Sequence, residues 1–318
     1  MLRTMKKSFS ISATCLLLLC CLNLIHAQTD SQAEKVISAL NANDCITAGR
    51  LAESMNKIDY RDKYGTSPLI YASRAGCLDV VKLLLDKSAR VDLQSNDGYT
   101  ALYMASRNGY TEIVKQLLEK GAKVDLMINA GATALYAAAQ KGHEEIVRLL
   151  LEKDAKIDQQ VNDEFSALFI AAQYGHTEVV KLLLAKGARI DLPTNRGATP
   201  LFIAATTGQT EIVHLLLDKG AKLEAKTRRG ATPLFTASQE GHPEVVNLLL
   251  QKGANINMQT IDGMSALAAA SARGNAEVVK LLLTKGADPN LKNKEGRTAI
   301  DLAKNEEIRT LISDHARK

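Results

Sequence analysis

The stretch Gly197–Ala221, GATPLFIAATTGQTEIVHLLLDKGA, decides the fold because the chain repeats it. From Glu164, 33 residues earlier, the chain reads EFSALFIAAQYGHTEVVKLLLAKGA, and from Gly230, 33 residues later, it reads GATPLFTASQEGHPEVVNLLLQKGA. The same spacing of 33 residues connects this turn position from Gly65 to Gly296 without an insertion. So regular a period indicates a stack of small units rather than a globule. We therefore predict an all-α repeat solenoid.

Each unit contains two short helical patterns. Thr199 can cap the first predicted helix, Pro200–Thr207, and Gly208 can end it in a left-handed conformation. The second predicted helix, Glu211–Lys219, carries an apolar run and is followed by Gly220. One unit cannot bury its apolar face alone, so stability must come from the contact of each unit with its neighbours.

The repeat frame gives the domain organisation. Residues 62–292 form seven full 33-residue repeats, residues 28–61 an N-terminal capping repeat, and residues 293–318 a C-terminal capping repeat with a tail. The last repeat lacks the inner Gly, so we expect a shortened second helix and a frayed tail over Ser313–Lys318. Asp154 and Glu164 both replace a Gly of the frame, which predicts a weaker junction between them.

Residues 1–27 have the pattern of a secretory signal peptide. Basic residues precede the apolar run Cys15–Ile25, and the small Ala27 marks the expected cleavage point. The alternative is an uncleaved anchor, but the run is about half the ~20 residues that a membrane-spanning helix needs. We expect an exported protein, periplasmic or secreted.

Two cysteines remain after such cleavage, Cys45 and Cys77. Both fall at the start of the second helix of adjacent repeats, and export would place them in an oxidising compartment. A disulfide requires Cα atoms within ~7 Å, whereas neighbouring helices pack ~8–10 Å apart. Two alternatives stay open: a bridge in a tilted first repeat, or two half-buried thiols.

The charge balance excludes a general affinity for polyanions. The chain has 40 basic and 35 acidic residues, and loss of residues 1–27 removes three basic residues and no acid, which leaves +2. A net charge so close to zero gives no overall attraction to nucleic acid or to an anionic membrane. We expect neither partner.

No constellation of residues points to catalysis. His143, His176 and His242 share one position of the repeat, so successive ones would lie ~10 Å apart, too far to share a zinc ion with ligand distances of ~2.1 Å. The chain has no Gly-rich phosphate loop and no strained elbow that presents a nucleophilic Ser. We predict a protein that is not an enzyme and that holds no metal and no cofactor.

The repeat resembles the ankyrin repeat family over about residues 31–318. The matching residues are Thr199-Pro200-Leu201-Phe202, Ala204-Ala205, Gly175-His176, Val179–Leu184 and Gly220-Ala221. The resemblance implies a stack of helix–turn–helix units with short β-hairpin-like loops, curved, with a concave face that binds a protein partner. The chain departs from the family at the position of its usual His, which holds Ile70, Tyr103, Tyr136, Phe169, Phe202 and Phe235. We interpret these rings as packing between repeats; the alternative is an aromatic track for a ligand.

The resemblance also places binding at the turn tips and on the exposed side of the first helices. Tyr, Phe, Met and Arg at such positions are typical of binding hot spots. The candidate protein-binding residues are Tyr64, Tyr99, Arg107, Phe165, Tyr174, Arg196, Arg228, Arg229 and Met264. Three of them, Arg196, Arg228 and Arg229, form a basic cluster that suits an acidic partner, and the alternative for each residue is a merely solvated rim.

These observations favour a non-catalytic, monomeric scaffold for protein–protein interaction that is exported from the cytoplasm. The alternatives are an accessory or regulatory partner of an exported enzyme, and a secreted effector that acts on host proteins.

Overall fold

The computed structural model describes residues 30–162 and 164–317. The predicted signal peptide, residues 1–27, lies outside this part of the chain. The remainder divides into two compact units, which we describe separately. Unit 1 comprises residues 30–105 and 112–123, and unit 2 comprises residues 106–111 and 124–317.

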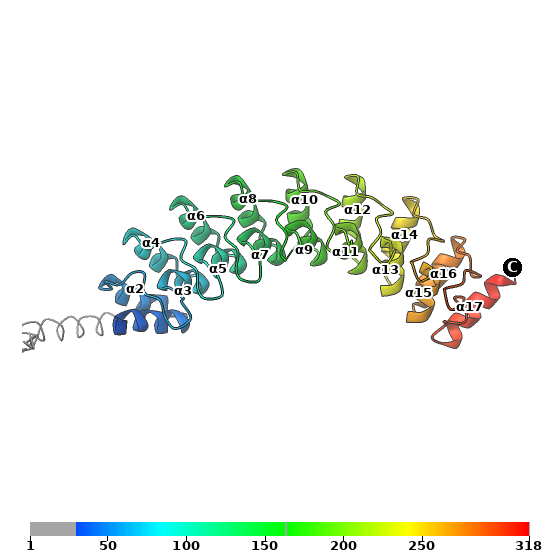
Figure 1. Ribbon diagram of the computed structural model, residues 1–318, viewed down its shortest axis with the longest axis horizontal. Helices are drawn as coiled ribbons and strands as arrows, with labels where there is room; N and C mark the ends of the chain where they lie inside the picture. Colours follow the sequence, from blue (N-terminus) through cyan, green and yellow to red (C-terminus); the bar gives the residue numbers. More distant parts are fainter. Residues whose placement is uncertain (1–29, 163, 318) are drawn as a thin grey trace, which may run out of the picture. The chain divides into compact units, whose positions relative to one another are not determined.

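Every full repeat consists of a first and a second helix, and within unit 2 these helices lie in two rows (Figure 1). The first helices are α3 (Pro68–Ala75), α5 (Ala101–Asn108), α7 (Ala134–Lys141), α9 (Ala167–Gln173), α11 (Pro200–Thr206), α13 (Pro233–Glu240) and α15 (Ala266–Arg273). The second helices are α4 (Leu78–Asp86), α6 (Thr111–Glu119), α8 (Glu144–Glu152), α10 (Thr177–Ala185), α12 (Thr210–Asp218), α14 (Pro243–Gln251) and α16 (Ala276–Thr284). The all-α repeat solenoid predicted from the sequence is confirmed.

Local capping chemistry sets the bounds of the helices. The hydroxyl of Thr199 accepts a hydrogen bond from the Phe202 backbone N–H at 3.2 Å, as the sequence predicts for the start of α11. Gly208 (φ 72°) follows α11 and Gly220 (φ 88°) follows α12, both in the left-handed region. The observed bounds of both helices differ from the predicted ones by one residue.

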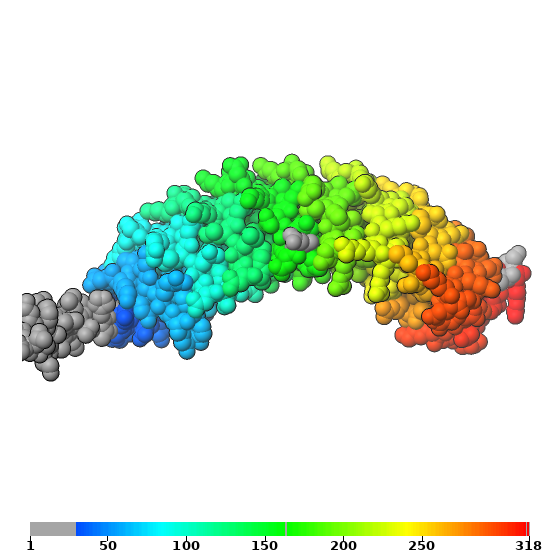
Figure 2. Space-filling model, viewed as in Figure 1, coloured from blue at the N-terminus to red at the C-terminus, as the bar shows by residue number. Residues whose placement is uncertain are grey.

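Small side chains let the first helices of unit 2 approach closely. Ala204 and Ala205 are fully buried on α11, which contacts α9 on one side and α13 on the other. Val213 and Leu216 of α12 are likewise fully buried, and α12 contacts α10 and α14. In the space-filling view the colours of unit 2 succeed one another in chain order, so each repeat contributes its own strip of surface (Figure 2).

A ladder of carboxylates also fastens repeat to repeat. In unit 2 the Asp191 carboxylate accepts a hydrogen bond from the Lys222 backbone N–H at 3.0 Å, across 31 residues. Six further pairs make the same link through a side-chain oxygen of an acid or an amide. The pairs are Asp59–Arg90 and Asp92–Lys123 in unit 1, and Asp125–Lys156, Asp158–Arg189, Glu224–Asn255 and Asn257–Asp288 in unit 2.

The N-terminal capping repeat in unit 1 consists of helical residues 30–41 and α2 (Cys45–Glu53). A disulfide joins Cys45, the first residue of α2, to Cys77, the N-cap of α4. Their Cα atoms are 5.3 Å apart, closer than the ~8–10 Å typical of packed helix axes. Of the two alternatives that the sequence leaves open, the structure has the bridge.

The C-terminal capping repeat differs from its prediction. Its first helix is reduced to a turn over residues 299–302, and its second helix, α17 (Glu306–Ala316), has 11 residues where the full repeats have nine. The expectation of a short second helix is therefore wrong, and so is that of a frayed tail as far as Ala316. Lys318 lies outside the described residues. Asn305 caps α17, and Ile308 and Ile312 are buried on this helix, which packs on α16. This burial holds the helix beyond the point where the repeat pattern ends.

In the described part of the junction after α8, two residues that are not Gly are left-handed. Asp154 has φ 59°, as its replacement of a frame Gly implies, and in the following turn Asn162 has φ 50°. The sequence prediction for this turn concerned Glu164, which directly follows Asp163, a residue outside the described part of the chain. Asn tolerates the left-handed region better than most residues, so the turn is formed through Asn162.

We expect Asp154→Gly to stabilise this junction by up to ~1 kcal/mol, because Gly removes the steric penalty of a positive φ. The measurement is amide hydrogen exchange across residues 150–165. The matched control is Gly187→Ala, at the same frame position, where an added Cβ meets no atom within 4 Å. This control isolates the conformational penalty of a Cβ at a positive φ, so amide exchange around residue 187 should be faster in Gly187→Ala. Equal exchange in the wild type, Asp154→Gly and Gly187→Ala would contradict the prediction.

Candidate protein-binding site

Backbone hydrogen bonds set successive turn tips of unit 2 side by side. The Arg228 N–H donates to the Arg196 carbonyl oxygen at 2.8 Å, and the Ile261 N–H donates to the Arg229 carbonyl oxygen at 2.9 Å. Within each tip, Thr227 and Thr260 accept hydrogen bonds from the backbone four residues later. The tips are therefore a fixed row rather than independent loops.

These tips and the adjoining first helices enclose a hollow of about 810 Å³. Four predicted binding residues line it: Arg196, Arg228, Arg229 and Met264. The rest of the wall comes from Phe202, Phe235, Thr236 and Gln239 of α11 and α13 and from Ala198, Thr227, Ala231, Thr260 and Asp262 of the tips. We call this the arginine hollow.

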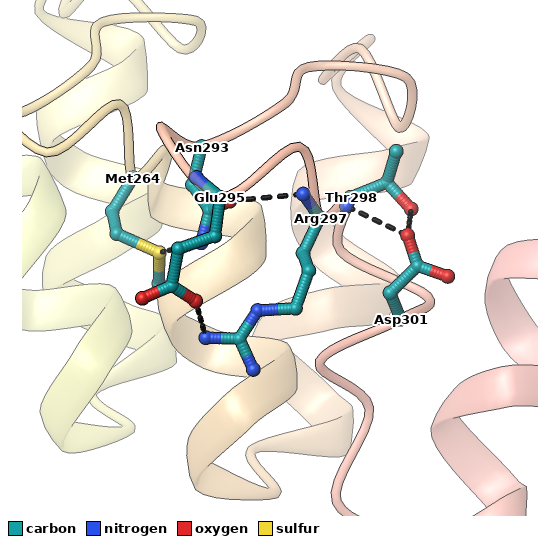
Figure 3. A network of polar contacts seen from close by, with 6 residues as sticks. All are labelled: Met264, Asn293, Glu295, Arg297, Thr298 and Asp301. Atoms are coloured by element: carbon teal, nitrogen blue, oxygen red, sulfur yellow. Dashed lines mark hydrogen bonds and ion pairs between the residues drawn. The ribbon is translucent and has the colours of Figure 1, made fainter.

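The three arginines of the hollow outnumber its one acid, Asp262. Within the described residues, no carboxylate forms an ion pair with Arg196, Arg228 or Arg229. In the C-terminal capping repeat, by contrast, the guanidinium of Arg297 pairs with Glu295 (Figure 3). The hollow therefore has a local positive charge although the protein is nearly neutral.

Met264 forms one wall of the hollow and is held from the next repeat. The Asn293 side-chain amide donates to the Met264 sulfur at 3.7 Å, and the Asn293 Oδ1 accepts from the Arg297 N–H (Figure 3). Beyond it, Asp301 accepts hydrogen bonds from the backbone and hydroxyl of Thr298. These bonds hold the pKa of Asp301 below its usual value, so this carboxylate stays charged and structural.

The residue four positions before each aromatic ring of a first helix decides whether that ring is covered. Tyr99 lies against Tyr103 of the same repeat, with ring centroids 5.5 Å apart, and Phe165 lies against Phe169 at 5.2 Å. Tyr103 and Phe169 are buried beneath these rings. At the same tip position the arginine hollow has Ala198 and Ala231, and there Phe202 and Phe235 are only half-buried.

The sequence interpretation of the aromatic series as packing therefore describes only part of it. Tyr103 and Phe169 are buried within their repeats, whereas Phe202 and Phe235 form the apolar floor of the hollow. The sequence signal that could have distinguished the half-buried rings from the buried ones is the alanine, Ala198 or Ala231, four residues before each half-buried ring.

The remaining predicted residues lie outside the hollow. Tyr64 is 57% exposed beneath the Lys63 ammonium, and Tyr174 is 54% exposed and stacks on His176. Arg107 is exposed, and Tyr99 and Phe165 are half-buried against the rings described above. Tyr64 and Tyr99 belong to unit 1, and the others to unit 2.

The recurring histidines link repeats. The Nε2–H of His176 donates to the Gln140 carbonyl oxygen at the end of α7 at 3.0 Å, and that of His242 donates to the Thr206 carbonyl oxygen at 3.0 Å. Asn275 has the same frame position and donates to the Gln239 carbonyl oxygen at 2.8 Å. Within the described residues, no group of three His, Cys, Asp or Glu side chains is arranged to hold a metal ion.

The carboxylates on the second helices also have structural partners. The Lys252 ammonium donates to Asp218 at 2.7 Å, and His214 lies 2.8 Å from the same carboxylate. The hydrogen bond from Lys252 is the main reason that the pKa of Asp218 lies below its ordinary value. A carboxylate held in its charged form is not suited to donate a proton at neutral pH.

A family model described as ankyrin repeats (3 copies) matches the chain in five overlapping segments, residues 15–128, 87–163, 124–194, 168–260 and 234–317. The chain belongs to the ankyrin repeat family. It is also similar to the crystal structure of the human ASB11 ankyrin repeat domain, with 32% sequence identity and a TM-score of 0.66. That match covers 70% of this chain and 100% of the other.

A search of curated proteins finds no match. Among the described residues, none of the helices has the length and apolar character needed to cross a membrane. Ankyrin repeats generally mediate protein–protein interaction, and such scaffolds are generally non-catalytic.

We expect His176→Ala to destabilise the stack by about 1 kcal/mol, because it removes one hydrogen bond between repeats. His176→Asn should retain most of the stability, since Asn275 makes the equivalent bond. The measurement is the apparent free energy of unfolding in urea, compared between the wild type and the two variants. Equal loss in both variants would contradict the prediction, because the Asn amide would then not replace the imidazole as the hydrogen-bond donor.

Proposed function

We propose that this ankyrin repeat protein is a non-catalytic scaffold that is exported from the cytoplasm and binds a protein partner. The observation that carries the proposal is the arginine hollow, where turn tips and first helices present three guanidinium groups beside half-buried rings. These groups form no ion pair with the described carboxylates. Arginine and aromatic side chains are the residues that most often carry the energy of protein interfaces.

Binding is assigned to the tips and first helices because the second helices serve the stack. Their apolar side chains are buried, and charged residues such as Asp218 pair with the next repeat. By contrast, Tyr64, Tyr174 and Arg229 lie exposed on tips or at the ends of first helices. Their side chains can contact a partner without any change in the fold.

Export is supported by two features. The first is the signal-peptide pattern of residues 1–27. The second is the Cys45–Cys77 disulfide, since such bridges persist in oxidising compartments and are rare in the cytosol. The partner is accordingly a protein of the periplasm or of the extracellular space.

To test binding, residues 28–318 are immobilised and used to capture a partner from the exported fraction. We expect the triple variant Tyr64→Ala, Tyr174→Ala, Arg229→Ala to lose at least ~10-fold in affinity for the captured partner, as expected for hot-spot residues. The matched control truncates Lys186, His214 and Lys285, which lie on or directly after second helices. Equal affinity of the triple variant and the wild type would place the interface elsewhere.

To test export, cells expressing the full chain are fractionated. We expect the protein in the exported fraction with Gln28 as its first residue, and with Cys45 and Cys77 protected from alkylation until a reductant is added. Reduction should lower the stability by about 3–4 kcal/mol in the chain-entropy estimate for a loop of this length. Recovery in the cytosol with both thiols free would refute export and leave the binding proposal standing.

A further inference from the structure

The arginine hollow combines two chemistries that restrict its occupant. The guanidinium groups of Arg196, Arg228 and Arg229 favour carboxylates, which they can bind through paired hydrogen bonds. The floor is apolar, because Phe202 and Phe235 are half-buried there and Met264 closes one side. One acid, Asp262, lies on the wall. A fitting ligand therefore presents acidic groups around an apolar centre.

The position of the rings relative to the charges follows from the fixed row of tips. The Arg228 N–H to Arg196 carbonyl bond sets the two arginine-bearing tips beside each other. The Thr206 and Thr236 hydroxyls are 2.9 Å apart and join α11 to α13, the helices that carry the rings. Both the tips and the helices that line the hollow are thus fixed to their neighbours before a ligand binds, so the ligand need not order the site at its own entropic cost.

The volume and the charge pattern favour a peptide segment. About 810 Å³ lies within the ~300–1,000 Å³ of pockets that enclose drug-sized ligands, which suits a few residues of an extended chain. A nucleic acid would need a longer basic stripe along the surface, whereas this cluster covers two tips of a nearly neutral protein.

We propose that the arginine hollow binds an acidic peptide segment of the partner, with one large apolar side chain between Phe202 and Phe235 and flanking carboxylates on Arg196, Arg228 and Arg229. The proposal rests on the proposed function, and it specifies the chemical class of the partner's binding segment.

The chain itself supplies the design of a blocking variant. Phe165 covers the Phe169 ring in its own repeat, and Ala231 has the equivalent position before Phe235. Ala231→Phe should therefore cover the Phe235 ring and close the hollow while leaving the three arginines in place. A second variant, Arg228→Gln with Arg229→Gln, removes the charge and leaves the floor open.

The test uses residues 28–318 to select binders from a random dodecapeptide display library. The affinities of synthetic copies are then measured by fluorescence polarisation. We expect the binders to be rich in Asp and Glu around one Phe, Leu or Met. Their affinity for the arginine double variant should be at least ~10-fold lower than for the wild type, because the variant loses charge-assisted hydrogen bonds. Added salt should weaken the binding of the peptides to the wild type. Ala231→Phe should abolish binding.

The matched control is Lys186→Gln with Lys285→Gln, which makes the same change in net charge at exposed ends of second helices. The peptides should bind this control within ~2-fold of the wild type, because neither lysine lines the hollow and exposed charges are screened by salt. Circular dichroism and thermal unfolding confirm the fold of each variant.

Four outcomes would overturn the proposal. Three are the absence of any selected peptide, binders without acidic residues, and equal binding to the arginine double variant. The fourth is a single-stranded oligonucleotide that competes with the peptides at equal concentration, which would assign the hollow to nucleic acid. The partner captured in the binding test distinguishes the two proposals. If that partner binds the arginine double variant as well as the wild type, the scaffold function stands and only the acidic-peptide site is refuted.

Discussion

The structure depends on burial between neighbouring repeats. A pair of helices of seven to nine residues has too little apolar surface of its own to offset the entropy lost on folding. Stacking solves this, because Ala204 and Ala205 on α11 and Leu216 on α12 become fully buried only when the adjacent helices are present. The constraint explains the constant period, since an insertion would displace the apolar face from its neighbour.

Hydrophobic burial alone does not fix how one repeat is oriented on the next, and polar contacts between repeats supply this orientation. Asp191 reaches the backbone of the next repeat at Lys222, and His242 reaches back to the end of α11. Such bonds are worth only about 1 kcal/mol each, but they fix the register and rotation of one repeat on the next. Together with the backbone bonds between tips, they hold in place the row of tips that lines the arginine hollow.

The sequence predicted the repeat, the bounds of α11 and α12 and the capping residues because these depend on local chemistry. Thr199 caps α11 whatever surrounds it. The disulfide was undecided because its formation depends on the tilt of α2 against α4, which no local pattern encodes. The C-terminal helix was misjudged because burial of Ile308 and Ile312, rather than the repeat pattern, holds α17. The carboxylate ladder was missed because its partners lie 31 residues away and meet only on stacking.

In the candidate site, too, some features follow from the local sequence and others arise only when the repeats stack. Arg196, Arg228 and Arg229 could be named from the sequence because their type and tip position are enough to suggest binding. That they share a hollow with Met264 depends on backbone bonds between tips, which the sequence does not display. The exposure of Phe202 and Phe235 depends on the small size of Ala198 and Ala231, where other repeats have Tyr99 and Phe165. Two methyl groups in place of two rings thus leave Phe202 and Phe235 half-buried in the wall of the hollow, where the other two rings are buried by packing.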